Sequence, residues 1–387
     1  MTLPLRVERV QTPADLMALA PACDELASRM SPRSPFATSS WLDHWWRHYS
    51  ESRLLVRDRF FVHTVRDAQN RLIAIAPLIL TERPGSGPLR SRNLYFFGSD
   101  KSITELRGLV CDRAHEAAAA RALLAHLQTI KSEWDWMVWN GIRKDGDAYG
   151  VLNEAPGFDW SSETTDHVLT LPGSWDEFRS TRSRNIKESL RKCYNSLKRD
   201  GHHFTFRVVS DPAETPEALR RFFELHARRA CAQHLVGHAD VFYEERARQL
   251  MLALAEDSNE ALSVRVFQLK IAGQVVASRL GFVLGDELYL YFSGFDPEWA
   301  AYSVMTTTVA EAIKWAIERG FKRVNLSPGT DVSKTRWGAV PITTCNGIMI
   351  SPTPRAKFVF RALSELNRRS RPGTLLGKVL NGARRVG

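Results

Sequence analysis

The stretch of residues 287–328 constrains the fold of this chain more than any other, because its pattern changes from strand to helix and back. Residues 288–292 read LYLYF, an apolar and aromatic run of strand length without polar alternation. A run that is apolar on both faces predicts a central strand of a sheet. From Ser303 the apolar residues follow helical spacing as far as Gly320, which is a typical helix stop. Residues 322–326 return as a short strand, parallel to the first if the crossover is right-handed.

The turn before this helix is the first candidate site. Ser303 precedes the helical pattern as an N-cap, and the first turn that follows, Val304 to Thr306, contains no acid. Its unpaired backbone N–H groups are therefore available to an anion such as a pyrophosphate. Every helix has an N-terminus and most bind nothing, so an ordinary helix start remains an alternative interpretation.

The same turn resembles a known family. Asp296-Pro297-Glu298, leading to Ser303-Val304-Met305, is similar to the acyl-CoA loop of GNAT-type N-acyltransferases. This sequence departs from that family at Ser303 and Met305, where glycines are usual. The segment of residues 289–338 also resembles acetyltransferase-like proteins associated with cellulose and exopolysaccharide gene clusters, which are related to Fem-type enzymes. The likeness extends over about residues 30–350.

The resemblance implies a fold, a co-substrate and a set of contacts. It implies an acyl-CoA, such as acetyl-CoA, held along the strand and the helix start, with the thioester beside a splay in the sheet where Ser293 lies. The residues it implies for acyl-CoA binding are Tyr291, Phe292, Ser303, Val304, Met305 and Thr306. Core packing is the alternative for the aromatic residues.

The loop after the last strand of this unit is the second candidate site. Its sequence, SPGTDVSKTRWG, gathers polar and charged groups beyond the carboxyl end of a parallel strand, where open α/β sheets bind ligands. Here Asp331 is a candidate base, acting through water, and Lys334 a candidate contact for an acidic substrate. Ser327 and Trp337 are candidate substrate contacts, and the alternative is a surface turn with Trp337 in the core. The predicted catalytic set is Ser293, Asp331 and Lys334.

A long helix predicted over residues 180–200 is strongly basic outside one apolar stripe. Arg184, Asn185, Lys187 and Arg191 are its candidate contacts with a phosphate-rich donor or the acceptor stem of a tRNA. A solvated charged face is the alternative.

The order of predicted elements recurs along the chain. A hairpin over residues 59–66 and 71–80 precedes strands at 93–97 and 105–111, a helix at 113–130 and a strand at 134–140. A second hairpin, at 261–269 and 274–283, precedes the strand, helix and strand described first. We therefore predict an α/β (α+β) fold of two tandem GNAT-like domains, each a mixed sheet flanked by helices. The expected domains are 1–170, a degenerate copy, and 171–352, the acyltransferase, followed by a basic amphipathic tail at 353–387.

Charge and cysteine content narrow the function classes. Of the net charge of +10, the last 33 residues carry nine Lys or Arg and one acid, so the rest of the chain is nearly neutral. The tail is expected either to rest on an anionic membrane surface or to form a packed helix with a frayed end. The five scattered cysteines and the lack of a long apolar segment predict a cytoplasmic protein, peripheral to the membrane at most.

The absence of the common catalytic and cofactor motifs also narrows the function classes. The sequence contains no Walker A, GxSxG or HExxH string, and no GxGxxG after a strand, so nucleotide and hydrolase functions lose their usual support. His226, His234 and His238 lack a Cys or carboxylate at ligand spacing, and no metal is expected. The leading hypothesis is transfer from acyl-CoA to an amine of a small molecule or glycan precursor. The alternatives are Fem-like transfer from charged tRNA, or a non-catalytic accessory protein of polysaccharide assembly.

Overall fold

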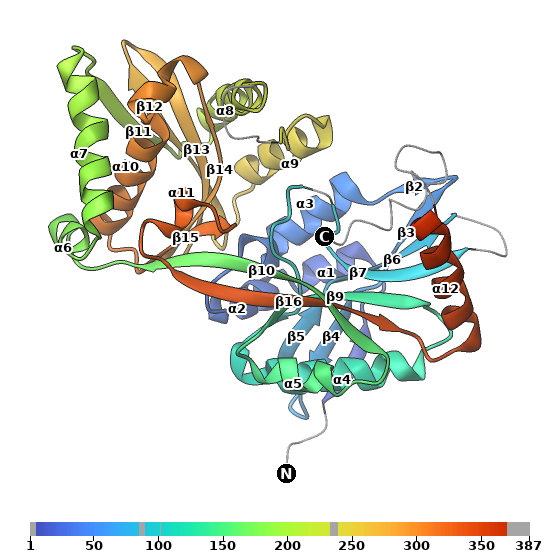
Figure 1. Cartoon of the computed structure of the whole chain (residues 1–387). Coiled ribbons are helices and arrows are strands. Elements are labelled where there is room, and N and C mark those ends of the chain that lie inside the picture. The colour runs from blue at the N-terminus through green and yellow to red at the C-terminus, as the bar shows by residue number, and fades with distance from the viewer. Residues whose placement is uncertain (1–4, 85–89, 101, 233–238, 370–387) are drawn as a thin grey trace. The chain divides into compact units, whose positions relative to one another are not determined.

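The computed structural model describes residues 5–84, 90–100, 102–232 and 239–369, and for residues 366–369 it describes the helix alone. The chain divides into two units (Figure 1). Unit 1 comprises Met1–Thr164 and Thr343–Gly387, and unit 2 comprises Thr165–Ile342. Both units are mixed α/β structures, as predicted.

The sheet of unit 2 has the strand order β11-β12-β13-β14-β15-β10. Its strands are β10 (Phe158–Thr170), β11 (Phe204–Val209), β12 (Ser263–Ile271), β13 (Gln274–Leu284), β14 (Glu287–Phe295) and β15 (Arg323–Pro328). Neighbouring strands are antiparallel except β14 and β15, which are parallel, as the crossover predicts. The predicted central strand, β14, thus lies between β13 and β15.

Helices cover both faces of this sheet (Figure 1). They are α6 (Trp175–Ser180), α7 (Arg184–Arg199), α8 (Thr215–Ala230), α9 (Glu245–Glu256), α10 (Val304–Glu318) and α11 (Val332–Thr335), with the 3₁₀ helix η2 (Pro297–Tyr302). One face is covered by α10, with α7 packed on it, and the other by α8, with α9 beside it. The prediction for α10 is confirmed: it follows Ser303 and ends just before Gly320, whose φ of 76° suits a glycine stop.

Unit 1 repeats this strand order and adds a second sheet. Its larger sheet has the order β16-β9-β7-β6-β3-β2, with β7 and β9 parallel, and its smaller sheet has the order β1-β4-β5-β8. The strands are β1 (Arg6–Arg9), β2 (Ser52–Arg53), β3 (Val56–Phe60), β4 (His63–Arg66), β5 (Leu72–Ala76), β6 (Leu78–Arg83), β7 (Ser91–Phe96), β8 (Val110–Cys111), β9 (Trp136–Arg143) and β16 (Val340–Ile350). The series β3-β6-β7-β9-β16 therefore matches β12-β13-β14-β15-β10 of unit 2, with a single parallel pair at the same place in each.

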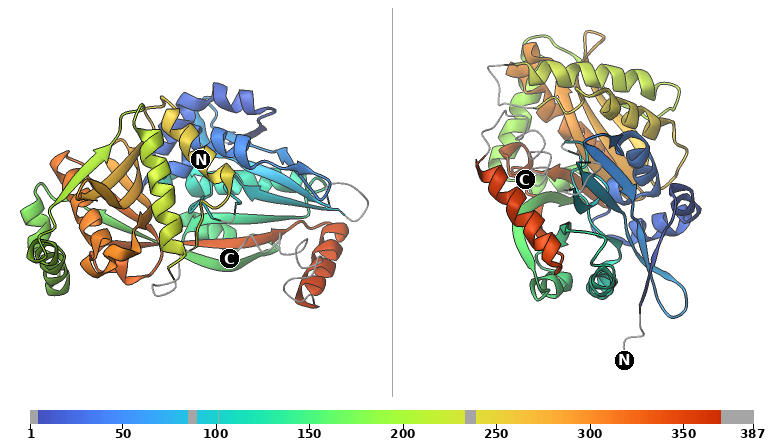
Figure 2. Two further views of the ribbon diagram at one scale, coloured as in Figure 1. Left: turned by 90° about the horizontal axis from the view of Figure 1, so that it is seen from above. Right: turned by 90° about the vertical axis from the view of Figure 1, so that its right-hand side faces the viewer.

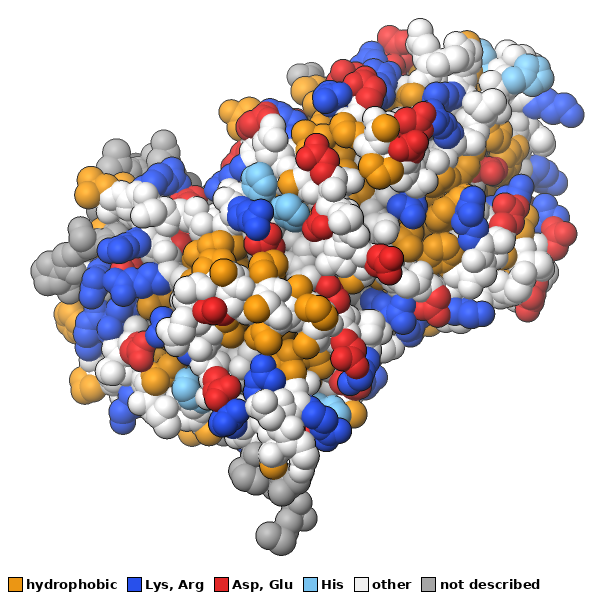
Figure 3. Space-filling model, turned by 180° about the vertical axis from the view of Figure 1, so that it is seen from behind, with side chains coloured by type: hydrophobic (Ala, Val, Ile, Leu, Met, Phe, Trp, Pro, Cys, Tyr) orange, Lys and Arg blue, Asp and Glu red, His pale blue; other side chains and the backbone are white. Residues whose placement is uncertain are grey.

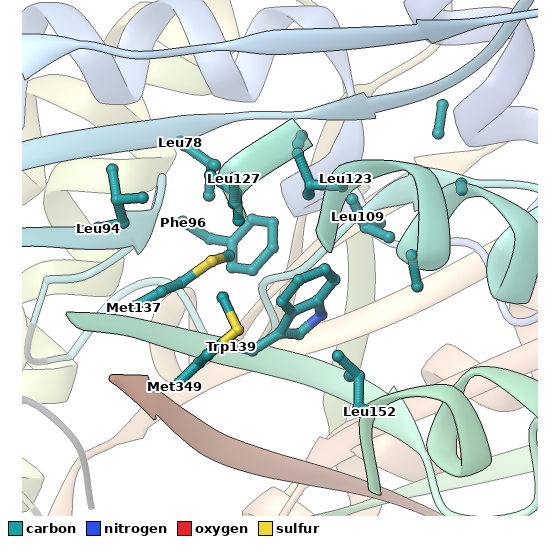
Figure 4. Packing of buried hydrophobic residues seen from close by; sticks show 14 of the residues in the cluster. Leu78, Leu94, Phe96, Leu109, Leu123, Leu127, Met137, Trp139, Leu152 and Met349 are labelled. Carbon is teal, nitrogen blue, oxygen red and sulfur yellow. The ribbon is translucent and has the colours of Figure 1, made fainter. Parts of the chain in front are cut away.

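The helices of unit 1 pack on these sheets. They are α1 (Pro13–Ala18), α2 (Ala20–Arg29), η1 (Pro35–Ala37), α3 (Ser39–Tyr49), α4 (Arg113–Thr129), α5 (Asp147–Asn153) and α12 (Pro354–Arg369). Leu123 and Leu127 of α4 meet Phe96 and Trp139 of the larger sheet in one core (Figure 4). Figure 2 shows α12 as a helix following the end of β16, and Phe360 of α12 packs edge-on against Trp136.

The domain boundaries differ from those expected. Both β10 and β16 run from one unit into the other, so the units divide at residues 164 and 342 rather than 170 and 352. Residues 343–352 belong to unit 1, because β16 pairs with β9 from Thr344–Arg143 to Ile350–Trp136. Residues 370–387 of the expected tail lie outside the described part of the chain.

The predicted hairpin at 59–66 and 71–80 is wrong in detail. Its two arms each divide between the sheets: β3 pairs with β6 in the larger sheet, and β4 with β5 in the smaller one. Pro77 separates β5 from β6 and has no N–H for a ladder, which ends the strand there.

The strand predicted at 105–111 is reduced to Val110–Cys111. The preceding residues form a loop that Asp100 organises, since its carboxylate accepts the N–H groups of Ser102, Ile103 and Thr104. Within the described residues no helix is long and apolar enough to span a membrane.

Candidate active site

The parallel strands β14 and β15 part within unit 2. Their pairing covers three positions, from Glu287–Arg323 to Tyr289–Asn325. Beyond these, β14 continues to Phe295 against β13, and β15 continues to Pro328 against β10. The sheet is therefore splayed beside Tyr291 and Phe292, where the resemblance to GNAT enzymes implies the thioester.

A bulge in β14 accompanies the splay. Gly281 pairs with Leu290 and Arg279 with Ser293, so two residues of β14 stand opposite one residue of β13. Such a bulge bends a strand and re-aims its backbone groups. Arg279 fixes the bend, since its Nη2 donates to the Leu290 carbonyl oxygen at 3.0 Å.

The start of α10 is open to an anion. Its N-cap, Ser303, is exposed, makes no side-chain cap and has a left-handed backbone with φ 54°. The first turn contains no acid. A cation lies beside it: Nη2 of Arg336 donates to Oγ1 of Thr306 at 2.6 Å. Backbone N–H groups, the helix dipole and this guanidinium all favour a negative group here.

The side chains implied for acyl-CoA binding are mostly packed inward. Val304 lies in a core with Leu197 of α7, and Met305 is half-buried against the same core. Tyr291 is buried beside the rings of Phe282 and Phe292, at centroid distances of 5.2 Å and 4.3 Å. What these positions offer a ligand is their backbone.

A thiol lies beneath the helix start. Cys193 of α7 is buried, and its pKa is raised by that burial, although Arg336 and hydrogen bonds from neighbours such as Ser303 lower it. At neutral pH this group is a thiol rather than a thiolate, so it is a packing group and not a nucleophile.

Ser293 is held by two groups of α8. Its Oγ accepts from Nη1 of Arg229 at 2.6 Å, and its carbonyl oxygen accepts from the His226 ring at 2.9 Å, if Nδ1 carries the proton. Burial lowers the pKa of His226, so this imidazole is neutral near pH 7. Among the described residues no group of three or more His, Cys, Asp or Glu side chains is arranged for a metal, and His234 and His238 lie outside them.

Asp331 and Lys334 lie near one another on α11. Asp331 caps this helix by accepting the Ser333 N–H at 3.0 Å, and its carboxylate is 4.0 Å from the Lys334 ammonium. Burial raises the pKa of Asp331, but the hydrogen bonds from Ser333 and the charge of Lys334 outweigh it, so the pKa lies below its ordinary value. Asp331 also interacts electrostatically with Arg229 and Arg336. The structure thus brings the predicted catalytic side chains into one region, but Asp331 is a weak base there.

The other predicted substrate contacts have different surroundings. Ser327 is buried at the end of β15 with φ 69°, and Trp337 is fully buried with its Nε1 donating to the Ser333 carbonyl oxygen. Trp337 is therefore a core residue rather than a substrate wall. The four candidates on α7 are exposed, namely Arg184, Asn185, Lys187 and Arg191. Arg184 pairs with Glu188 at 2.7 Å, and the buried stripe of α7 faces the other way.

Asp166 is a polar residue of the site that the sequence analysis missed. It lies on β10 and is 3% exposed, and its Oδ2 accepts from Nδ2 of Asn325 at 2.9 Å. Burial raises the pKa of Asp166 to about 6, although Asn325 and Lys334 lower it. The available signal was the pair Asp166-His167 directly before the apolar residues Val168 and Leu169.

Comparisons with known proteins agree with this architecture. The family model described as the acetyltransferase (GNAT) domain matches residues 184–335. The structure of FemX is similar with a TM-score of 0.59 and 12% identity, covering 88% of this chain and 96% of that one.

A second solved structure is similar over most of the chain. It is the C-terminal domain (DUF2156) of a protein described as a lysylphosphatidylglycerol synthetase from Agrobacterium fabrum, with a TM-score of 0.51 and 12% identity over 92% of this chain and 97% of that one. A search of the curated proteins gave no match. At these identities the structures establish the fold, and together with the family model they show that unit 2, which contains the matched residues 184–335, has the GNAT acetyltransferase fold.

Proposed function

We propose that unit 2 transfers an acyl group directly from acyl-CoA, with acetyl-CoA as the leading co-substrate, to an amine. The acceptor class we propose is a sugar, an amino acid or a precursor of the cell envelope or an exopolysaccharide. The observation that carries the proposal is the exposed, uncapped start of α10 beside the splay of β14 and β15.

Each part of this arrangement supplies one requirement of the reaction. The N–H groups of Val304 and Met305, with the guanidinium of Arg336, hold the pyrophosphate. The backbone of β14 beyond Tyr289, freed from pairing with β15, orients the thioester arm and donates to its carbonyl oxygen. The amine attacks the thioester carbon directly, so the protein needs no covalent residue.

The start of α10 is tested by placing an acid in it. We expect acetyl-CoA to raise the thermal midpoint of the protein, because a ligand bound only by the folded state stabilises it. Met305→Glu adds a negative charge to the first turn of α10, where it disfavours an anion, and is expected to abolish that rise. Asn195→Glu, which adds the same charge on the exposed part of α7, is the control and should keep it. An unchanged rise in Met305→Glu contradicts the assignment.

Turnover is tested separately from binding. Acetyl-CoA is offered with glucosamine, lysine and cadaverine, and release of the free CoA thiol is followed together with the mass of the acylated amine. Binding of acetyl-CoA without any acylated product would favour the non-catalytic accessory role. Absence of both would contradict the proposed function as a whole.

Fem-like transfer from charged tRNA is the second candidate. The observation that favours it is the basic solvent face of α7, where Arg184, Lys187 and Arg191 are exposed. The net charge elsewhere argues against an extended RNA interface: in Figure 3 basic and acidic side chains are interspersed over the face shown. A thermal rise with charged tRNA that falls steeply with salt, and is lost in Arg191→Glu but not in Met305→Glu, would favour this candidate.

Peripheral contact with an anionic membrane through the basic tail is also proposed. Residues 371–387 contain four Lys or Arg and no acid. Deletion of these residues is expected to reduce binding to phosphatidylglycerol vesicles and to leave phosphatidylcholine vesicles unbound. Equal binding before and after the deletion would remove the proposal.

A further inference from the structure

Unit 1 contains a polar cavity of about 200 Å³ that is partly open to solvent. It lies on the neighbouring strands β10, β16 and β9 and beside the loop before β8, and every residue that lines it belongs to unit 1. The polar side chains that line it include those of Asn140, Ser162, Thr164 and Asn346 from the strands, and Glu105 and Arg107 from the loop.

A bulge in β9 shapes this cavity. The register of β9 against β16 shifts so that two residues of β9, Asn140 and Gly141, stand opposite Asn346 alone. Gly141 has a φ of 76°, and a Cβ there would lie 2.2 Å from the Arg107 carbonyl oxygen, so only glycine fits beneath the loop. Bulges re-aim side chains and are frequent beside functional sites.

Asn346 fixes the orientation of the Asn140 amide. The Gly141 N–H donates to Oδ1 of Asn346 at 3.3 Å, which identifies this atom as the amide oxygen. Asn140 must therefore present its NH₂ group, and its Nδ2 donates to the same oxygen at 3.1 Å. Nδ2 of Asn346 in turn donates to Oγ of Ser162 at 3.1 Å. As a result, Oδ1 of Asn140 is not used by this network.

The cavity offers hydrogen-bonding groups that the protein does not satisfy. Asn140 is only 8% exposed, yet no described residue donates to its Oδ1. The hydroxyl of Ser162 accepts from Asn346 but donates to no described acceptor, and Oγ1 of Thr164 has no partner in the described part of the chain. Leaving an almost buried amide oxygen without a donor is costly, so a polar molecule in the cavity is favoured.

The charged groups around the cavity balance one another. Nη1 of Arg107 donates to the Gly98 carbonyl oxygen at 2.6 Å, and Glu163 pairs with Lys144 at 2.5 Å. Together with Glu105, these ionised side chains amount to two acids and two bases. A charged ligand would leave water without a surplus of opposite charge to receive it, and a neutral ligand avoids that cost.

We propose that this cavity binds one ring of a neutral sugar through its hydroxyl groups. A hydroxyl both donates and accepts, so neighbouring hydroxyls can donate to Oδ1 of Asn140 and accept from Ser162 and Thr164. The cavity has the volume of about six or seven water molecules, which suits a single ring and is too small for a nucleotide or coenzyme A. This site lies in unit 1 and does not depend on the acyl transfer proposed for unit 2.

The test is isothermal titration of the full chain with glucose, galactose, N-acetylglucosamine and cellotetraose, which separate a free sugar from the end of a glycan. At least one of them should bind. Thr164→Val keeps the shape of the side chain and removes one hydroxyl, so Kd should rise about two- to tenfold. Asn140→Ala removes the buried acceptor and should raise Kd about tenfold or more. Thr205→Val, the same change at an exposed position of β11, should leave Kd unchanged.

Alanine and glucose 6-phosphate serve as charged probes of the same cavity. Binding of either of these alone would overturn the assignment to a neutral sugar, and equal Kd values in wild type, Thr164→Val and Asn140→Ala would overturn the site. Absence of binding by all probes would mean that the cavity holds water only. Thermal midpoints check that the variants are folded. Met305→Glu should keep sugar binding and Thr164→Val should keep the rise with acetyl-CoA, so failure of this site and failure of the acyl-transfer proposal are distinguished.

Discussion

The helices α4 and α10 follow the equivalent strands of the two units, yet their N-termini are built in opposite ways. In unit 1 the N-cap of α4 is Asp112, which accepts the Ala114 N–H at 2.9 Å, and Glu116 adds a second acid in the first turn. In unit 2 the start of α10 has neither a side-chain cap nor an acid, and Arg336 lies beside it. A side chain caps the first turn of α4, whereas the first turn of α10 has no side-chain cap and its first N–H groups suit an anion.

The strands before these helices show the same contrast. The parallel pairing of β7 with β9 covers two positions, Asn93–Trp136 and Leu94–Met137, so unit 1 is splayed as unit 2 is. In unit 1, however, the loop before β8 packs against β9 just beyond the splay. A Cβ at Gly141 of β9 would lie 2.2 Å from the Arg107 carbonyl oxygen, and Leu109 packs with Trp139 (Figure 4). The fold alone therefore does not make a site, which also needs a splay and a helix start left open.

The largest expected effect is on the stability of unit 1, through the loop before β8 that Asp100 organises. Asp100 is 2% exposed and accepts from three backbone N–H groups, from Thr104 Oγ1 and from Trp45 Nε1. Asp100→Ala leaves these donors without a partner and should lower the free energy of unfolding of unit 1 by about 3–5 kcal/mol. Hydrogen exchange should show lost protection in residues 98–109, while acetyl-CoA still protects the start of α10. Loss of acetyl-CoA protection would contradict the assignment of the site to unit 2.

The buried carboxylate of unit 2 should behave differently, because stability there depends on pH. The pKa of Asp166 is raised from 3.8 to about 6 in the folded chain, so ionisation opposes folding. Its contribution is fully favourable below pH 3.8 and is lost as the pH rises to about 6, a change of about 3 kcal/mol. Asp166→Asn does not titrate, so its free energy of unfolding relative to wild type should rise by that amount between pH 4 and pH 7. Denaturant unfolding of both proteins across this range measures it, and a constant difference would contradict the raised pKa.

The sequence predicts the repeated α/β order and the elements of unit 2 well because β14 and α10 have strong local patterns. The sequence predicts less well those features that depend on contacts between residues far apart in the chain, such as strand pairing. Pro77 marks a break, but only pairing with other strands decides that β5 and β6 enter different sheets. Asp166 shows the same limit for the site: its chemistry depends on Asn325, which is 159 residues away, and on burial that no local pattern reveals.

The two helix caps should differ in a paired substitution. Asp112→Ala removes a hydrogen-bonded cap and should cost about 1 kcal/mol of stability. Ser303→Ala removes a side chain that does not cap α10 and loses only its hydrogen bond with Cys193, so the change should be smaller than in Asp112→Ala. Thermal midpoints of the two variants, with and without acetyl-CoA, check both expectations. An equal loss in both variants would show that Ser303 supports its helix and that the contrast between the units is smaller than proposed.

The smallest expected effect concerns Ser303 itself, whose left-handed φ of 54° is a conformation that glycine adopts without strain. Ser303→Gly relieves that strain but adds conformational entropy to the unfolded chain, so a net gain of about 0.5–1 kcal/mol is expected. The smaller residue also lets a phosphate approach the backbone more closely, and acetyl-CoA should bind a few-fold more tightly. Gly98 of unit 1 has no room for a side chain, because a Cβ there would lie 2.2 Å from the Thr104 side chain. Gly98→Ala should therefore lower the stability of unit 1 without changing acetyl-CoA binding. Weaker acetyl-CoA binding in Ser303→Gly would mean that the serine hydroxyl, rather than the exposed backbone, holds the anion at the start of α10.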